Sequence, residues 1–91
     1  MTAVSVRDVV LSVVLDVSRQ RNPERTQTEP AHALGADLAF DSLDLAQVAA
    51  ELEIRLGIDP FARHATSRIV TVGDLIALYE QASSATPVAA K

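Results

Sequence analysis

The chain has 91 residues, the size of one small domain, and contains no cysteine. This length allows a single core without metals, while the lack of cysteine excludes disulfides and any thiol nucleophile of the protein's own, as is typical of intracellular proteins. A formal net charge of −4 with one Tyr and two Phe argues against nucleic-acid binding, because phosphates attract Lys and Arg.

Three segments begin with the same pattern. A polar capping residue is followed three residues later by Asp, and an apolar pair flanks the first turn, which resembles a capping box with Asp in place of Glu. In the first segment Ser5 is the cap, followed by Asp8, with Val4 and Val9 as the apolar pair. In the second, Asp41 is the cap, followed by Asp44, with Phe40 and Leu45 as the pair. In the third, Thr71 is the cap, followed by Asp74, with Val70 and Leu75 as the pair. These starts predict three long helices, over about Val6 to Arg19, Ser42 to Leu56 and Val72 to Ala82.

The first predicted helix repeats valine at the spacing of one helix face, and strand-like alternation fails there. The positions are Val6, Val9, Val10, Val13, Val14 and Val17. Its longest apolar run, Val9 to Leu15, is interrupted by Ser12 and is too short to cross a bilayer. No basic region precedes it, so it does not resemble a signal peptide. We therefore expect a soluble, cytoplasmic protein with no membrane partner.

A long loop over Gln20 to Ala39, rich in charge and containing Pro23 and Pro30, connects the first two helices. Loops of this length in small domains are often functional. The second helix should stop at Gly57, the residue type that favours the left-handed conformation just past a helix end.

A short helical turn is expected over Phe61 to Thr66, between the second and third long helices. The fold prediction is thus an all-α four-helix bundle, with three long helices and one short one. Ser83 to Lys91 is small, polar and contains Pro, and it is expected to form a disordered tail after a domain of residues 1–82.

The helix over Ser42 to Leu56 has two apolar stripes when it is drawn with 100° per residue. The predicted core stripe consists of Leu45, Val48, Ala49, Leu52 and Leu56. The opposite stripe consists of Leu43, Gln47, Ala50 and Ile54. Apolar side chains exposed on a helix face are stabilised by burial on a partner. The second stripe therefore indicates a docking surface, although Leu43 could instead tuck under the loop and Ile54 could be an isolated surface residue.

Acidic residues concentrate around Ser42. Between Asp37 and Asp59 six acidic residues accompany one basic residue, Arg55, for a local net charge of −5. Such a patch favours partners with basic docking surfaces. The predicted partner face combines this charge with the apolar stripe and consists of Leu43, Asp44, Gln47, Ala50, Glu51 and Ile54.

Ser42 at a helix start would ordinarily be interpreted as a cap. Asp41 already supplies that cap, which leaves the serine available for another role. A serine hydrolase is not indicated, because Phe40 and Asp44 occupy the glycine positions of the G-x-S-x-G elbow. The only candidate bases are two histidines, His32 and His64, and they show no metal-ligand spacing with the scattered carboxylates. We expect neither catalysis nor a metal site.

The residues around Ser42 resemble the phosphopantetheine attachment site of acyl and peptidyl carrier proteins. In that family an LGxDSL-like approach enters a helix, a Gly-Ile-Asp-like turn ends it, and an Ile-x-Thr-Val stretch opens the last helix. The matching segments are Leu38 to Leu43, Gly57 to Asp59 and Ile69 to Val72. The resemblance implies that Ser42, flanked by Asp41 and Leu43, carries 4′-phosphopantetheine derived from CoA and acts as a tether, not as a nucleophile.

The resemblance also implies partners: a phosphopantetheinyl transferase, a ligase or acyltransferase that loads acyl or aminoacyl groups, and a downstream synthase or transferase. Gln47, Ile54 and Arg55 stand where fatty-acid carriers are often acidic. This departure argues against a housekeeping role in fatty acid synthesis. With one carrier domain over 91 residues, the chain resembles a free-standing, monomeric carrier of polyketide, antibiotic or other natural-product biosynthesis. The alternative is a helical adaptor that presents the same face and is never modified.

Overall fold

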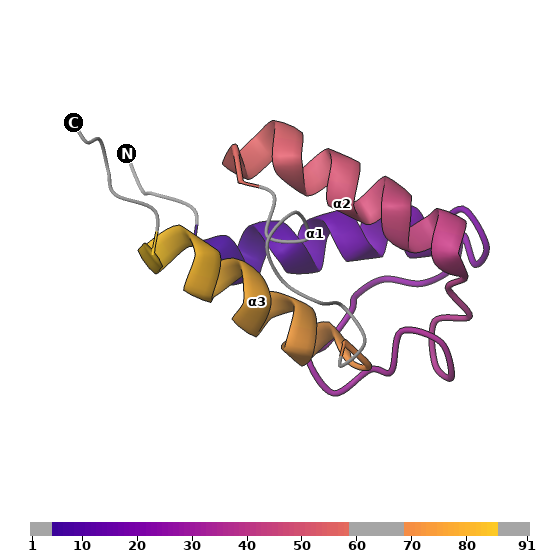
Figure 1. Ribbon diagram of the computed structural model, residues 1–91. Helices are drawn as coiled ribbons and strands as arrows, with labels where there is room; N and C mark the ends of the chain where they lie inside the picture. Colours follow the sequence, from indigo (N-terminus) through magenta and orange to yellow (C-terminus); the bar gives the residue numbers. More distant parts are fainter. Residues whose placement is uncertain (1–4, 59–68, 86–91) are drawn as a thin grey trace.

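The computed structural model describes residues 5–58 and 69–85 of the chain, and this part is all-α (Figure 1). Its helices are α1 (Val6–Ser18), α2 (Ser42–Leu56) and α3 (Val72–Ala85). Helix α1 packs against both α2 and α3. The predicted short helix over 61–66 lies outside the described residues.

The predicted helix starts are confirmed, and the ends differ slightly. Helix α1 ends at Ser18, with Arg19 as its C-cap, and Gly57 ends α2 in the left-handed conformation at φ 72°. Helix α3 continues to Ala85, three residues past the predicted end at Ala82. The cause is local, because no Gly or Pro interrupts the chain before Pro87. Helix α3 thus includes residues 83–85 of the predicted tail, and residues 86–91 lie outside the described residues.

The three capping side chains accept hydrogen bonds as predicted, and the reciprocal bond of a capping box is present at α2 and α3 but, among the described residues, not at the start of α1. The Ser5 hydroxyl accepts a hydrogen bond from the Asp8 N–H at 3.1 Å. At the start of α3, the Thr71 hydroxyl accepts from the Asp74 N–H at 3.0 Å, and the Asp74 carboxylate accepts from the Thr71 N–H at 3.0 Å. The apolar pair there is not buried together, since Val70 is 59% exposed while its partner in the predicted pair is buried.

The core draws on all three described helices and on the loop between α1 and α2. Its buried apolar residues are Val10, Val13, Val14 and Val17 of α1; Leu34, Leu38 and Phe40 of the loop; Val48 and Leu52 of α2; and Val72, Leu75, Ile76 and Tyr79 of α3. The loop is thus part of the packed domain.

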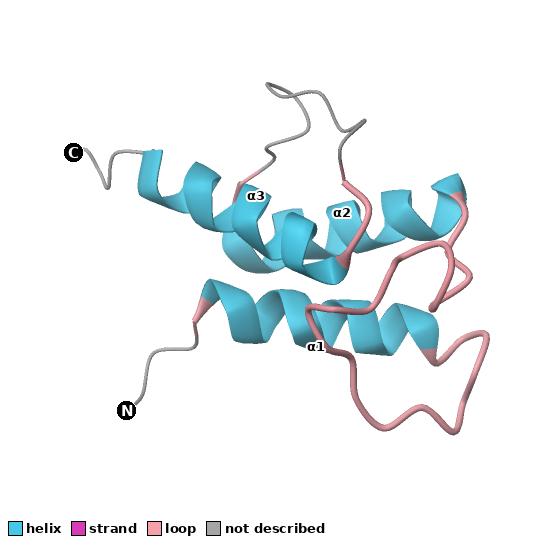
Figure 2. Ribbon diagram, turned by 90° about the horizontal axis from the view of Figure 1, so that it is seen from below, coloured by secondary structure: helices cyan, strands magenta, loops and turns pink. Residues whose placement is uncertain are grey.

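Hydrogen bonds fasten this loop, residues 19–41, to the helices on either side. Figure 2 shows the whole connection as loop and turns. The buried Thr28 hydroxyl donates to the Leu11 carbonyl of α1 at 2.8 Å. The Leu34 N–H donates to the Val70 carbonyl, just before α3, at 2.8 Å. The long loop therefore leads to the start of α2 along a fixed path.

The last turn before α2 contains an unusual backbone conformation at Ala39, whose φ is +60°. Side chains with a Cβ atom rarely adopt this left-handed region, where Gly is favoured. Two hydrogen bonds close the turn around it, from the Ala39 N–H to the Gly35 carbonyl at 3.0 Å and from the Phe40 N–H to the Leu34 carbonyl at 2.9 Å.

Candidate functional site

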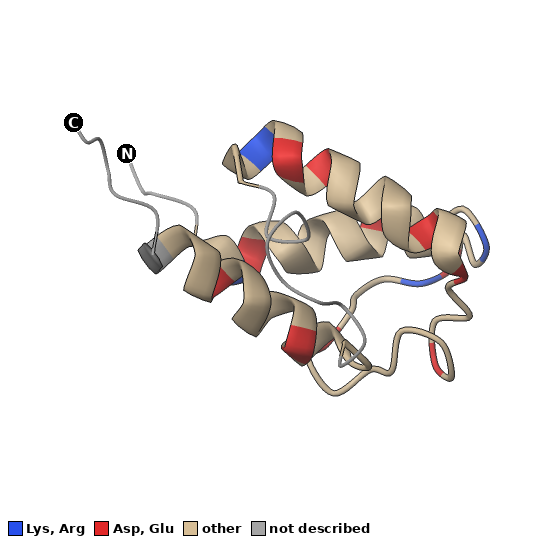
Figure 3. Ribbon diagram, viewed as in Figure 1, with Lys and Arg blue, Asp and Glu red and all other residues tan. Residues whose placement is uncertain are grey.

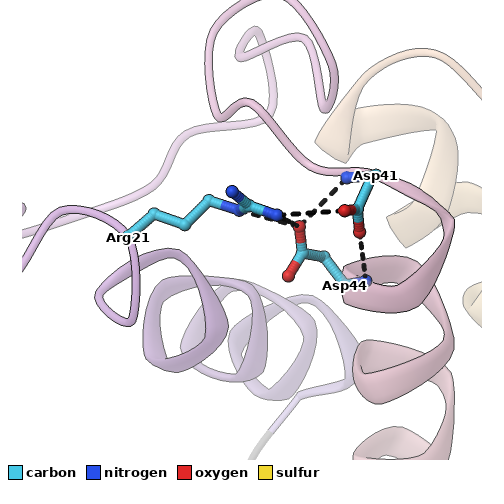
Figure 4. A network of polar contacts seen from close by, with 3 residues as sticks. All are labelled: Arg21, Asp41 and Asp44. Carbon is cyan, nitrogen blue, oxygen red and sulfur yellow. Dashed lines mark hydrogen bonds and ion pairs between the residues drawn. The ribbon is translucent and has the colours of Figure 1, made fainter.

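Helix α2 begins with a reciprocal capping box formed by Asp41 and Asp44 (Figure 4). The Asp41 carboxylate accepts from the Asp44 N–H at 2.9 Å. The Asp44 carboxylate in turn accepts from the Asp41 N–H at 3.0 Å. Because both residues are engaged in this way, the first turn of α2 is fixed without any contribution from Ser42.

Ser42 is exposed and is the first residue of α2. Its hydroxyl makes no hydrogen bond to any described residue, so the capping role that a serine here would ordinarily have belongs to Asp41. The backbone N–H groups of Ser42 and Leu43 likewise have no acceptor within the described chain. Free N–H groups and the positive end of the helix dipole favour an anion at this position.

One residue of this site, Arg21, has no recognisable signal in the sequence and lies in the turns after α1. Its Nη2 atom is 2.6 Å from Oδ2 of Asp44 and 3.2 Å from Oδ2 of Asp41. Its Nε atom donates to the same Asp44 oxygen at 2.8 Å. Arg21 thus bridges the two aspartates that flank Ser42.

This network perturbs the titration of both partners. The hydrogen bond from the Asp41 N–H lowers the pKa of Asp44, and the Arg21 guanidinium lowers it further against the opposing effect of burial. The hydrogen bond and charge of Asp44 raise the pKa of Arg21. The carboxylate of Asp44 is therefore held in its ionised form.

Asp44, a member of the predicted partner face, is largely covered in the structure. The side chain of Asp44 is only 12% exposed, whereas that of Asp41 is 61% exposed. The N3 position of a capping box points its carboxylate back at the helix start, which turns this charge away from solvent. Figure 3 shows acidic positions at both ends of α2. The negative charge near Ser42 is smaller than the local net charge of −5 counted from the sequence, because Arg21 pairs with Asp41 and Asp44.

The two predicted stripes of α2 are confirmed. On the core side, Val48 and Leu52 are buried, and Leu45, Ala49 and Leu56 are partly buried. On the outer side, the exposed fractions of Leu43 and Ile54 are 76% and 78%. Gln47 and Ala50 between them are exposed. Leu43 therefore does not tuck under the loop.

Glu51 of the predicted partner face lies at the edge of the outer stripe. Its side chain is 46% exposed, and its Oε1 atom is 3.9 Å from Nε of Arg55. Arg55 also approaches Asp16 of α1, with 3.7 Å between Nη2 and Oδ2. The long, exposed ion pair with Arg55 holds Glu51 weakly, so the charge of Glu51 stays accessible.

His32 forms no hydrogen bond with Ser42. Nδ1 of His32 accepts a hydrogen bond from the Glu29 N–H at 3.0 Å, which fixes the imidazole within the loop. His64 lies outside the described residues. Within residues 5–58 and 69–85, no group of three potential ligands could hold a metal ion.

Comparison with known proteins gives no relative for this chain: no family model, curated protein or solved structure matches it significantly. None of the described helices combines the length and apolar character that a membrane span requires.

Proposed function

We propose that this chain is a carrier protein on which Ser42 bears 4′-phosphopantetheine. The observation that carries the proposal is the exposed Ser42 hydroxyl, which Asp41 relieves of the capping role. It lies beside a large exposed apolar residue, Leu43, at the head of an apolar stripe. The proposed fold is the four-helix carrier bundle, with its short helix within residues 61–66. We place the protein in the cytoplasm as a monomer.

In the attachment step Ser42 Oγ forms a bond to the phosphorus atom that is linked to the pantetheine of CoA. The bond from that phosphorus to the bridging oxygen of the pyrophosphate breaks, and adenosine 3′,5′-bisphosphate leaves. The hydroxyl proton passes to a base of the transferase. The role of the chain is to present Ser42, which needs an accessible hydroxyl on a rigid helix start and no base of its own.

The start of α2 suits a phosphodiester in two respects. The N–H groups of Ser42 and Leu43 are free within the described chain, and the helix dipole favours an anion there. Arg21 balances part of the negative charge of Asp41 and Asp44, which reduces their repulsion of the phosphate. When attached, the group supplies the thiol that a chain without cysteine lacks, and it holds acyl or aminoacyl groups as thioesters.

The outer stripe of α2 supports repeated docking of different enzymes. Leu43 and Ile54 expose large apolar surfaces at opposite ends of the helix, with Gln47 and Ala50 between them. The proposed partners are a phosphopantetheinyl transferase, an acyl- or aminoacyl-loading ligase or acyltransferase, and a downstream synthase or transferase of natural-product biosynthesis. In this proposal the chain is a substrate of these partner enzymes and catalyses no reaction itself.

Intact-mass measurement after incubation with CoA, Mg²⁺ and a broad-specificity transferase tests the proposal. The wild-type chain should gain the mass of one phosphopantetheine group, and Ser42→Ala should gain nothing. Ser12→Ala is the matched control, because Ser12 is also an exposed helical serine, and it should be modified like the wild type. An unmodified wild-type chain in a reaction that loads a known carrier would instead favour the unmodified adaptor.

A further inference from the structure

The Arg21 guanidinium forms ion pairs with the two carboxylates through which the start of α2 could attract a partner. It contacts the buried carboxylate of Asp44 and the exposed carboxylate of Asp41 through the same Nη2 atom. The Arg21 side chain is itself 44% exposed. A partner approaching Ser42 therefore meets a positive group of the carrier beside the aspartates.

We infer that Arg21 is a specificity-determining residue, which competes internally with the basic groups of partner enzymes for the acidic end of α2. The inference rests on the proposed function and names how the same site selects its partners. An enzyme that docks mainly by placing Lys or Arg beside Asp41 is disfavoured, whereas an enzyme that docks on the apolar stripe is accepted.

The geometry supports competition at Asp41 more than at Asp44. Asp41 offers an exposed carboxylate, so a basic group can reach it only by sharing or displacing Arg21. Asp44 is nearly covered and is already satisfied by two donors, the Asp41 N–H and Arg21. Close like charges oppose association, and pairing with Arg21 removes the attraction that would otherwise steer a basic surface to this end.

The remaining accessible carboxylates of α2 lie toward its other end. Glu53 is exposed and forms no ion pair with a described residue, and the charge of Glu51 is only weakly held. The carboxylates that can attract a basic partner therefore lie at the end of α2 far from Ser42, while the apolar Leu43 lies beside the serine. This separation lets apolar contact decide recognition at the attachment site.

Stopped-flow association of the carrier with a transferase of basic docking surface, at several salt concentrations, tests this inference. Arg21→Gln should raise the association rate constant about two- to fivefold at low salt and steepen its salt dependence, because Asp41 is uncovered. Arg19→Gln is the matched control. Arg19 is exposed and forms no ion pair with a described residue, so this variant changes net charge equally but should change the rate less.

Arg21→Lys separates charge from folding. It keeps a positive group near Asp41 and should associate at nearly the wild-type rate, whereas a purely structural role would slow the glutamine variant and leave the salt slope unchanged. Equal rates for Arg21→Gln and Arg19→Gln, with a wild-type chain that is modified, would overturn the inference and leave the carrier function standing. A wild-type chain that is never modified would overturn both.

Discussion

Asp41 and Asp44 donate to and accept from each other across the first turn of α2, and Ser42 between them adds no hydrogen bond within the described chain. Ser42→Ala should therefore change the free energy of unfolding by less than about 0.5 kcal/mol, as is usual for a surface site. Asp41→Ala should lower it by about 1 kcal/mol, because the cap is lost. Chemical denaturation of both variants measures the difference, and an unfolded Ser42→Ala protein would show that the serine is structural.

The core and outer stripes of α2 differ in how much truncation should cost. Leu52 is completely buried, so Leu52→Ala leaves a cavity and should lower the free energy of unfolding by about 2–5 kcal/mol. Ile54→Ala removes a side chain of similar size that is 78% exposed, and its effect should stay within about 0.5 kcal/mol. Thermal melting followed by circular dichroism compares the two. Similar shifts for both variants would contradict the assigned orientation of α2.

The parts of this structure that the sequence predicts are those fixed by nearby residues. Each helix start follows from a cap and an Asp three residues apart, and the two faces of α2 follow from helical spacing alone. The exposed position of Ser42 is predictable in the same way, because it depends only on the adjacent capping residue. The patterns extend over a turn or two, so one sequence is sufficient to find them.

The unpredicted parts depend on residues that are distant in the chain. Arg21 meets Asp44 and Asp41 across separations of 23 and 20 residues, and no periodicity relates a loop cation to a helix cap. The same holds for Thr28, whose partner Leu11 lies 17 residues away. The negative charge accessible around Ser42 is therefore smaller than a count of nearby carboxylates indicates, because Arg21 pairs with Asp41 and Asp44.

The left-handed turn before α2 offers a test by stabilisation. Ala39 has φ +60°, which costs a residue with a Cβ atom roughly 1–2 kcal/mol. Ala39→Gly removes this cost but adds the chain entropy of Gly, so we expect a net gain of up to about 1 kcal/mol. Ala36→Gly, in the same exposed turn without positive φ, should give no gain. Denaturant midpoints compare the pair, and destabilisation by Ala39→Gly would contradict the assigned conformation.

The capping aspartates should make the fold sensitive to acid. The pKa of Asp44 is lowered from its usual 3.8, mainly by the Asp41 N–H, and that of Asp74 is lowered mainly by the Thr71 N–H, with help from Val70. A carboxylate whose pKa is lower in the folded state stabilises the fold above its unfolded pKa. Both contributions are complete above the usual value and are lost as pH falls through the folded pKa values.

Stability should therefore decline as pH falls below about 4, the range where unfolded Asp begins to bind protons. Asp74→Asn keeps a hydrogen-bond acceptor but cannot titrate, so its stability should depend less steeply on pH in this range than that of the wild type. Asp8→Asn is a useful control, because no hydrogen bond to its carboxylate is present in the described chain. Equal slopes for Asp74→Asn and the wild type would contradict this assignment.

Partner binding should separate the charge of α2 from its apolar stripe. Glu51→Lys reverses an accessible charge and should slow association of the modified carrier with an enzyme of basic docking surface, more so at low salt. Ile54→Ala removes apolar contact, so dissociation should accelerate roughly tenfold with little change in the salt dependence of association. The matched controls lie off α2: Glu80 is exposed and Val70 is 59% exposed. Stopped-flow measurements should find Glu80→Lys and Val70→Ala close to wild type, and if they match the α2 variants instead, the docking face is not on α2.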